Sequence, residues 1–307
     1  MQCGNKKVFV VIPNKNGVRH LVYSLSSLAD TLYGNFETVV VDDQSTDESL
    51  AFIKKNFPAI KVIMTEVNKG FAGAVNEGIR YSRDHGAEYI AIFNSDIKVL
   101  PEWMEFAVDL CRKRPDAGLV GFTEVSRERE DLFCRLKMEE VEYKEVKRLC
   151  GCLFICPAKV FRHIGIFDED YFMYGEDNDF FSRLTRAGYS ILETNIPVWH
   201  YGAGASQGGS FLATWLTYRN AIRYSLKNES FFGICRMVFS LLNQGCNRFL
   251  YKNSTDAFAK RIRRYNPFIN FLLIVMSCGW NIFHIISTLR ARWDSIRQIK
   301  KRRDVTI

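Results

Sequence analysis

The first 122 residues alternate between short apolar runs rich in β-branched side chains and longer segments with the apolar spacing of a helix. Five runs are expected to be strands: Val8–Pro13, Thr38–Asp43, Ile60–Thr65, Tyr89–Asn94 and Ala117–Phe122. Four segments between them are expected to be helices: Val18–Thr31, Asp47–Asn56, Ala72–Arg83 and Pro101–Arg114. Strands that lack a polar face must be covered on both sides. The pattern therefore predicts a doubly wound α/β fold around a mostly parallel sheet.

Local signals support two of the expected helix starts. Ser45 and Glu48 have the spacing of a capping box, and Pro101 suits a first helical turn. In doubly wound sheets, ligands bind beyond the carboxyl ends of the strands. We therefore expect polar residues that follow three of the strands to share one rim: Asn14–Asn16, Asp42–Asp43 and Asn94–Asp96.

A second informative feature is the acidic, aromatic segment from Gly165 to Tyr189. Carboxylates stand among aromatic side chains at Asp168, Glu169, Asp170, Glu176, Asp177 and Asp179. Carboxylates beside apolar rings lose hydration and repel one another, so chemistry is the usual reason to keep such a cluster. The alternative is an ordinary helix start, where acidic residues suit the positive end of the helix dipole.

The cysteine pattern and the amino terminus indicate a reducing, cytosolic compartment. The chain has nine cysteines but no pair of CxxC motifs. Cys150, Cys152 and Cys156 lie in an apolar stretch that is typical of a buried strand, so we interpret them as structural thiols and not as a zinc site. The first apolar run is too short for a signal peptide and leads directly into the expected first strand.

The charge distribution points to a membrane surface and away from nucleic acid. The net charge is +8, and much of the excess follows residue 250. Tyr265–Leu289 has no formal charge, but Asn270, Asn281 and His284 interrupt it, and each is costly in hydrocarbon. Basic flanks on both sides favour helices that lie in the cytoplasmic leaflet, on the cytoplasmic face of the cell membrane. The alternative is a helical pair packed on the protein's own core or on a second copy in a homo-oligomer.

Residues 123–148 form a highly charged segment of mixed sign that interrupts the strand and helix alternation. We interpret it as a surface excursion over the active face, and an ordinary solvated helix is the alternative.

Five motifs occur in a fixed order along the chain: Pro13–Gly17 (PNKNG), Val41–Ser49 (VDDQSTDES), Asn68–Ile79 (NKGFAGAVNEGI), Asn94–Asp96 (NSD) and Glu176–Phe180 (EDNDF). In order and spacing they closely resemble the motifs of the inverting family 2 glycosyltransferases, which have the GT-A fold. The resemblance covers roughly residues 7 to 225. It predicts a glycosyltransferase domain over residues 1–225, followed by a C-terminal apolar and basic helical region over 226–307.

The resemblance implies a nucleotide-sugar donor and assigns residues to it. Pro13, Asn14 and Asn16 match the loop that borders the base and ribose. Asp42 and Asp43 match the acidic pair that reads the nucleobase, which favours a dTDP- or UDP-sugar. Lys15 departs from the aromatic residue or Arg that is frequent at its position. The donor phosphates, ribose or sugar would be contacted by residues of the next two motifs: Lys69, Gly70, Asn76, Asn94 and Ser95.

The resemblance also implies a divalent metal, Mg²⁺ or Mn²⁺, and a carboxylate base. Asp96 is the expected metal ligand, although Asn94 replaces the first acid of the family's DxD motif, and His200 would complete the shell. Asp177 matches the usual base, with Glu176 as the alternative, and Asp179 is expected to anchor the loop. The acceptor pocket would include residues of the acidic, aromatic segment: Asp168, Glu169 and Tyr174.

The predicted function is metal-dependent, inverting transfer of a sugar to a hydroxyl of a glycan or lipid-linked glycan. The acidic, aromatic segment is most similar to that of rhamnosyltransferase-type members of bacterial surface-polysaccharide pathways. Two other functions are weighed against it. A sugar nucleotidyltransferase has a Gly-rich, basic loop after its first strand, which PNKNG lacks. A membrane-bound scaffold without turnover would not need Asp96, Asp177 and His200 together.

Overall fold

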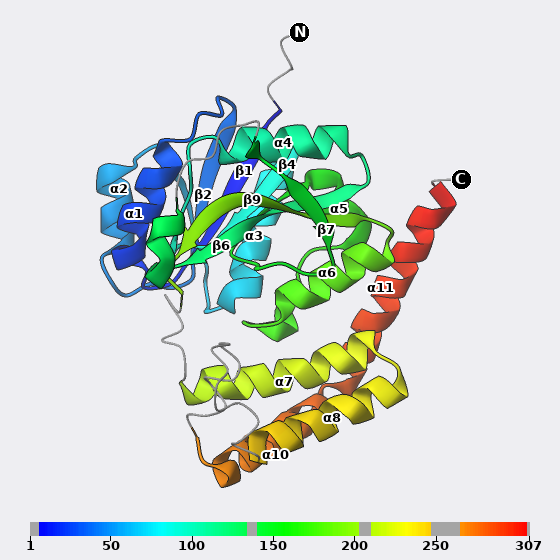
Figure 1. Cartoon of the computed structure of the whole chain (residues 1–307). Helices are drawn as coiled ribbons and strands as arrows, with labels where there is room; N and C mark the ends of the chain where they lie inside the picture. Colours follow the sequence, from blue (N-terminus) through cyan, green and yellow to red (C-terminus); the bar gives the residue numbers. More distant parts are fainter. Residues whose placement is uncertain (1–5, 134–139, 203–209, 247–264, 306–307) are drawn as a thin grey trace.

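The computed structural model describes residues 6–133, 140–202, 210–246 and 265–305. Its centre is a nine-stranded mixed sheet with the strand order β3-β2-β1-β4-β8-β6-β9-β5, and β7 pairs with β9 (Figure 1). The strands are β1 (Val8–Asn14), β2 (Phe36–Asp42), β3 (Lys61–Met64), β4 (Tyr89–Phe93), β5 (Ile97–Lys98), β6 (Ala117–Ser126), β7 (Tyr143–Val146), β8 (Leu153–Pro157) and β9 (Ser190–His200).

The four strands from the first part of the chain are parallel, as predicted. β1 pairs with β2 and β4, and β2 pairs with β3, all in parallel register. β8 then lies antiparallel between β4 and β6, while β6 and β9 are again parallel. The expectation of full burial is confirmed for β1 and β4 in their apolar residues, but β3 is an edge strand and is only half-buried.

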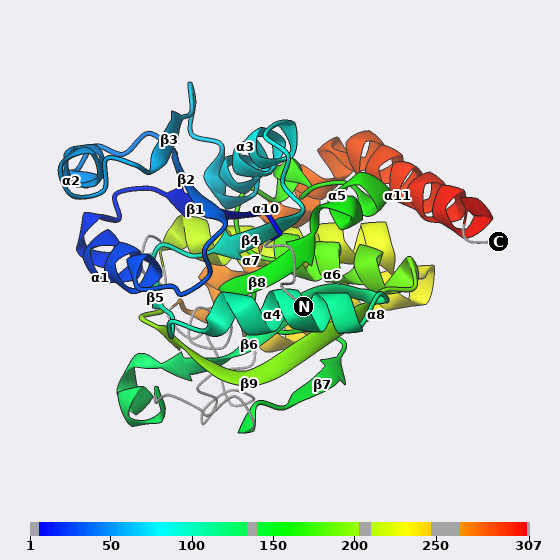
Figure 2. The same ribbon diagram turned by 90° about the horizontal axis from the view of Figure 1, so that it is seen from above.

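Helices cover both faces of the sheet (Figure 2). One face packs against α1 (Val18–Ala29) and α4 (Trp103–Lys113). The other packs against α3 (Gly70–Asp84), α5 (Ala158–Ile164) and α6 (Glu176–Arg186). α2 (Ser49–Asn56) follows β2. The predicted α/β architecture is therefore confirmed.

Two predicted helix starts are wrong. α4 begins at Trp103, so Pro101 precedes the helix and is not in its first turn. α2 begins at Ser49 without a side-chain cap, because the Ser45 hydroxyl accepts hydrogen bonds from the Asn14 side chain and the Asn16 backbone instead. Ser45 therefore joins the loops after β1 and β2.

The charged segment after residue 122 is not an ordinary helix. β6 continues to Ser126, a 3₁₀ segment follows at Arg127–Leu132, and β7 adds an exposed strand beside β9. Residues 134–139 lie outside the described residues.

The predicted buried strand around the cysteines is shorter than expected. Cys156 is within β8, whereas Cys150 and Cys152 precede it.

The last third of the described chain forms α7 (Phe211–Asn228), α8 (Phe231–Cys246), α10 (Pro267–Phe283) and α11 (Ile285–Val305). α7, α8 and α10 share a small apolar core, and α11 runs past α5 and α6 (Figure 1). The expected domain boundary at residue 225 falls inside α7. The division into residues 1–225 and 226–307 stays a prediction.

The polar residues that interrupt the apolar segment lie inside the protein. Asn270 and Asn281 of α10 are both buried, and the Asn281 side chain donates to the backbone oxygen of Arg219 at 2.9 Å. Among the described helices none is both long and apolar enough to span a membrane alone. α10 and α11 pass this test only as a pair that bends by 66°.

Candidate active site

The loops after β1 and β2 are joined by buried polar contacts. Asn14 donates through Nδ2 to Asp42 Oδ1 at 3.0 Å, and Asp42 Oδ2 accepts from the Ser45 backbone at 2.9 Å. Asn16, at a positive φ of 51°, accepts through Oδ1 from Thr46 N at 2.7 Å. The expected rim is therefore present, and these three side chains set the shape of its loops.

Asp43 connects this rim to the start of α3. Its Oδ1 accepts from Lys69 N and Thr65 Oγ1, both at 2.8 Å, and its Oδ2 accepts from Gly70 N at 2.9 Å. Gly70 has a φ of 67°, and a Cβ there would lie 2.5 Å from the Phe172 carbonyl oxygen. Glycine is thus required, because the α3 start and the segment around Phe172 approach each other closely.

Two other predicted donor residues have contacts of their own. The Lys69 ammonium pairs with Glu77. Asn76 is fully buried, and its amide holds the backbone of Phe167 through a donor and an acceptor contact, both 2.9 Å long. Asn76 therefore fixes the backbone of the acidic, aromatic segment at Phe167, and its contact with the donor stays a prediction.

A cavity of about 490 Å³ lies between the rim, the start of α3, the segment Phe172–Tyr174 and the start of α7. It is lined by Pro13, Asn14, Lys15, Asn16, Asp43, Gly70, Tyr174 and apolar residues of α7. Lys15 donates to the Asp43 carbonyl oxygen at 3.0 Å and thereby brings a positive charge to the cavity wall. A cavity of this size can hold a small organic ligand.

The two predicted metal ligands meet at the far end of the sheet rim. Asp96 follows β4 and is buried, and its Oδ1 lies 3.4 Å from Nε2 of His200 at the end of β9. His200 also contacts Glu124 of β6 through Nδ1. Burial alone would lower the pKa of His200, but hydrogen bonds to Asp96, Cys150 and Glu124 raise this pKa to about 12.

Two thiols beside His200 are not expected from the sequence interpretation. Cys150, Cys152 and His200 each place one ligand atom within 4.8 Å of the others. The backbone oxygen of Cys152 accepts from Asn94 N at 2.9 Å, so the same segment fixes the loop that contains Ser95 and Asp96. The interpretation of Cys150 and Cys152 as structural thiols stays a prediction, and the structure adds that both lie next to His200. The CxC spacing of the two cysteines is the sequence signal that could have indicated a shared site. Their proximity to His200 could not be predicted, because β8 and β9 are far apart in the sequence.

Two acidic residues lie at the start of α6, next to this segment. The helix follows Gly175, which has a φ of 90°. A Cβ on Gly151 would lie 2.8 Å from Asp177 Oδ2, so the Cys150–Cys152 backbone passes directly over the Asp177 carboxylate. Glu176 is only 7% exposed, and its Oε2 has no hydrogen-bond partner among the described residues. Burial, followed by repulsion from Asp177, raises the pKa of Glu176 to about 8.

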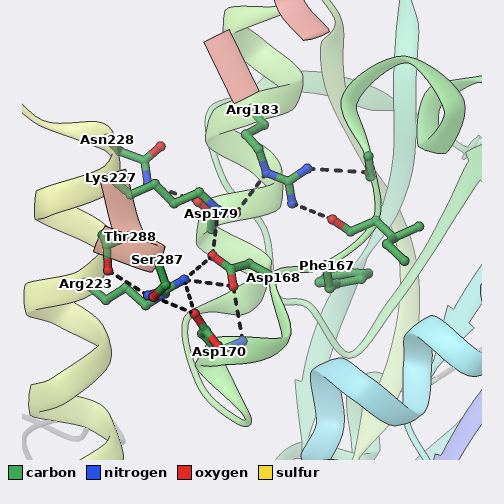
Figure 3. A network of polar contacts seen from close by, with 12 residues as sticks. Phe167, Asp168, Asp170, Asp179, Arg183, Arg223, Lys227, Asn228, Ser287 and Thr288 are labelled. Atoms are coloured by element: carbon green, nitrogen blue, oxygen red, sulfur yellow. Dashed lines mark hydrogen bonds and ion pairs between the residues drawn. The ribbon is translucent and has the colours of Figure 1, made fainter. Parts of the chain in front are cut away.

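Asp168 and Asp179 of the acidic, aromatic segment belong to a buried ion network (Figure 3). Arg223 of α7 pairs with Asp168 at 2.9 Å, and Lys227 bridges Asp168 and Asp179. Arg183 completes the network with a 2.8 Å contact to Asp179. Burial would raise the pKa of Asp168, but Lys227 and Arg223 hold it below its ordinary value. Asp179 thus anchors the segment as expected. Asp168 does so as well, which differs from its predicted acceptor role.

Backbone contacts hold the part of this segment that faces the cavity. Arg219 donates to the Tyr171 carbonyl oxygen at 2.6 Å, and the Asn220 amide donates to the carbonyl oxygens of Tyr171, Met173 and Tyr174. Phe172 and Tyr174 both have positive φ values, 63° and 73°. Non-glycine residues rarely adopt such a backbone unless neighbours impose it. Glu169, also predicted to meet the acceptor, instead pairs with Arg80 at 2.7 Å.

Residues 9–165 match the family described as Glycosyl transferase family 2. The chain belongs to this family. It therefore contains a glycosyltransferase domain, and the comparisons give no support to the alternative of a sugar nucleotidyltransferase. Residues 132–200 also match a model described as the N-terminal domain of galactosyltransferase.

Several curated relatives are named glycosyltransferases, and the three described here are bacterial. An uncharacterized glycosyltransferase of Haemophilus influenzae is 28% identical over 59% of this chain and 61% of its own. The Escherichia coli UDP-Glc:alpha-D-GlcNAc-diphosphoundecaprenol beta-1,3-glucosyltransferase WfgD is 24% identical over 54% and 68%. The N-acetylglucosaminyl-diphospho-decaprenol L-rhamnosyltransferase of Mycobacterium tuberculosis is 25% identical over 60% and 72%. The match thus spans about three fifths of the length of some of these relatives.

Solved structures share the fold. The S. aureus TarS fragment 1–349 aligns with a TM-score of 0.57 at 16% identity and covers 88% of both chains. GalNAc-T7, solved with UDP, GalNAc and Mn²⁺, aligns with a TM-score of 0.60 at 16% identity, over 91% of this chain and 57% of its own. At these identities the likeness concerns the fold alone, and it agrees with the GT-A fold predicted from the sequence.

Proposed function

We propose that this glycosyltransferase moves a sugar from a dTDP- or UDP-sugar to a hydroxyl of a lipid-linked glycan, with inversion and with a divalent metal. One observation carries the proposal. The short Cys150–Cys152 segment approaches the Asp177 carboxylate through Gly151 and His200 through its thiols, and His200 in turn contacts Asp96. A proton acceptor and a cation site are thus adjacent, which a direct displacement with a diphosphate leaving group requires.

Asp177 is the better candidate for the base. Glu176 is buried, and its raised pKa of about 8 leaves it mostly protonated at neutral pH, so in this form it is too weakly basic to accept a proton from a hydroxyl. Asp177 is partly exposed. Burial raises its pKa as well, but a backbone hydrogen bond from Asn178, which Oδ1 accepts at 2.7 Å, opposes this shift and stabilises the carboxylate. We infer that Asp177 removes the acceptor proton and that the neutral Glu176 keeps a second negative charge away from it.

The residues at the cation site suit Mg²⁺ or Mn²⁺. Asp96 offers carboxylate oxygens, His200 offers an imidazole nitrogen, and Glu124 is in contact with the same imidazole. Oxygen ligands are what hard cations prefer, and an imidazole favours Mn²⁺ over Mg²⁺. A cation held there would neutralise the negative charge that develops on the departing diphosphate. Asp96 and His200 would hold it.

The cavity beside Asp43 is the proposed donor site. Asp43 and Lys15 bring charges of opposite sign to its wall, and the positive charge suits a diphosphate. The relatives differ in their named donors: the E. coli enzyme is named for UDP-Glc and the mycobacterial one for L-rhamnose. Both names specify diphospho-polyprenol acceptors, which supports a lipid-linked acceptor here. Rhamnose transfer is the narrower form of this proposal.

The apolar surface of the C-terminal helices supports a peripheral site at an anionic membrane. Figure 1 shows α8 and α10 on the side of α7 away from the sheet. Phe232 and Phe283 are 83% and 86% exposed there, and further apolar side chains are exposed on the same helices and on α11: Phe231, Phe239, Phe268, Val275, Met276, Ile282, Ile286 and Trp293. A soluble monomer rarely exposes so many large apolar side chains. Attachment would bring a lipid-linked acceptor to the site.

A donor screen tests the proposed function. Release of nucleoside diphosphate is measured with UDP-glucose, dTDP-rhamnose and a GDP-sugar, each with Mn²⁺, with Mg²⁺ and with chelator, in the presence of a diphospho-polyprenol acceptor. We expect release from a uridine or thymidine donor only, and only with metal. Full release in chelator, or equal use of the GDP-sugar, would refute the proposal.

A further inference from the structure

The thiols of Cys150 and Cys152 lie at the cation site without a role in the proposed reaction. Each has its sulfur within 4.8 Å of a His200 ring nitrogen, and the two sulfurs also lie within 4.8 Å of one another. Three groups of the kinds that bind zinc are therefore gathered around one point. Asp96 adjoins this group, with its carboxylate 3.4 Å from the same histidine. Cys150 is partly exposed, which gives an ion a way in.

The spacing of these groups suits a tetrahedral ion. Zinc binds sulfur at about 2.3 Å and nitrogen at about 2.0–2.1 Å, so its ligand atoms lie roughly 3.5–4 Å apart. Because the three ligand atoms lie within 4.8 Å of one another, inward movements of less than about 1 Å would bring them to that spacing. Thiolates prefer soft or borderline cations such as Zn²⁺, and carboxylates and water suit Mg²⁺ and Mn²⁺.

We propose that Cys150, Cys152 and His200 form a thiophilic metal site that binds Zn²⁺ and excludes the activating cation. The two sites share His200, so only one can be filled at a time. Zinc held by two thiolates and this imidazole takes the nitrogen ligand away from the cation site at Asp96 and therefore blocks transfer. This consequence for activity rests on the proposed function, whereas binding itself does not.

Binding is tested with Co²⁺ as a spectroscopic substitute for zinc on the full chain, under a non-chelating reductant. Cobalt bound to thiolate has an intense near-ultraviolet charge-transfer band that oxygen and nitrogen ligands do not give. We expect a band that saturates at one Co²⁺ per chain and disappears when one equivalent of Zn²⁺ is added. Cys150→Ser should lose the band, and Cys235→Ser, which changes an exposed thiol on α8, should keep it. A missing band, or an unchanged band in Cys150→Ser, overturns the site.

A second measurement needs no variant. Iodoacetamide labelling followed by peptide mapping should show that Zn²⁺ protects Cys150 and leaves Cys235 reactive. Equal labelling of Cys150 with and without Zn²⁺ overturns the proposal even if Cys150→Ser does not fold.

The shared ligands are tested by inhibition of sugar transfer. Zn²⁺ should inhibit transfer by the wild type, and excess Mn²⁺ should relieve this inhibition. Half-maximal inhibition of Cys150→Ser should need a Zn²⁺ concentration at least about tenfold higher, because changes at a metal site commonly lower metal affinity by this factor or more. If the cobalt band is present but Zn²⁺ does not slow transfer, the zinc site and the activating cation do not share His200. If no transfer is detected with any donor, the proposed function fails, and the cobalt and labelling results still decide the site.

Discussion

Replacement of Glu176 by Gln should stabilise this protein, and the gain should grow with pH. Glu176 begins α6, is buried, and has one carboxylate oxygen without a hydrogen-bond partner among the described residues. Burial and the nearby Asp177 raise its pKa from 4.5 to about 8. Glutamine has nearly the same shape as the protonated acid but cannot ionise, so Glu176→Gln removes this penalty and little else.

The size of the effect follows from the two pKa values. The carboxyl binds its proton more tightly in the folded state, so the unfolded chain binds fewer protons between pH 4.5 and pH 8. The stability contribution of Glu176 is complete below its unfolded pKa and is lost as the pH rises through this window. At pH 7 the unfolded chain has lost this proton and must take it up to fold, which lowers the free energy of unfolding by about 3 kcal/mol relative to pH 4.5. This value follows from roughly 1.4 kcal/mol for each pH unit above 4.5. Near pH 4.5 the cost is close to zero.

The assay is thermal unfolding of wild type and Glu176→Gln between pH 5 and pH 8, with Glu105→Gln on the exposed face of α4 as the matched control. A kcal/mol moves the midpoint of domains of 150–250 residues by about 2–4 °C and that of a longer chain by less, so we expect a rise of roughly 5 °C at pH 7. The rise should shrink toward zero at pH 5, and the control should show no trend. A pH-independent gain, or destabilisation at pH 8, would refute the burial argument.

Three further outcomes are expected. Asp177→Asn should lower the rate of transfer by about a hundred- to ten-thousand-fold because it removes the base, with donor affinity measured by calorimetry nearly unchanged; near-normal transfer would exclude Asp177 as the base. Arg223→Met should lower the free energy of unfolding by about 3–5 kcal/mol, because it leaves Asp168 with fewer counter-charges in the buried network. Arg112→Met, at an exposed position, should have little effect, and equal losses of stability for the two variants in urea unfolding would contradict the network. Phe232→Ser combined with Phe283→Ser should reduce sedimentation with anionic vesicles at low salt, whereas wild type that ignores such vesicles would rule out the membrane surface.

The sequence predicts the first half of the sheet well because the signal there is local. Val8–Asn14 and Tyr89–Phe93 are short apolar runs between helix-period segments, and a run without a polar face fits only a strand covered on both sides. β8 is also an apolar run, but nothing within it specifies that it lies antiparallel between β4 and β6. Strand order and direction depend on contacts between distant segments, which periodicity does not report.

The same distinction applies to the candidate site. Motif order places Asp96, His200 and Asp177 correctly at one end of the sheet, because each follows a strand or begins a helix whose position the fold fixes. It does not show that Asp168 pairs with Arg223, a residue from a helix 55 positions later. The sequence does not distinguish the acidic residues of one segment from each other. Their partners in the folded chain show which of them hold the segment in place and which are free to react.

The partners of α7 connect the C-terminal helices to the site. Arg219 and Asn220 hold the carbonyl oxygens of the segment Asp170–Tyr174, which borders the cavity. Asn281 of α10 donates to the backbone of Arg219, and Thr288 of α11 accepts from Arg223 at 2.7 Å. Polar side chains inside an apolar helix are costly unless they are paired, and here they pair with the element that supports the cavity wall. The helices with the exposed apolar surface thus also brace the segment next to Glu176 and Asp177. α7 would therefore couple contact with a membrane to the position of the segment Asp170–Tyr174.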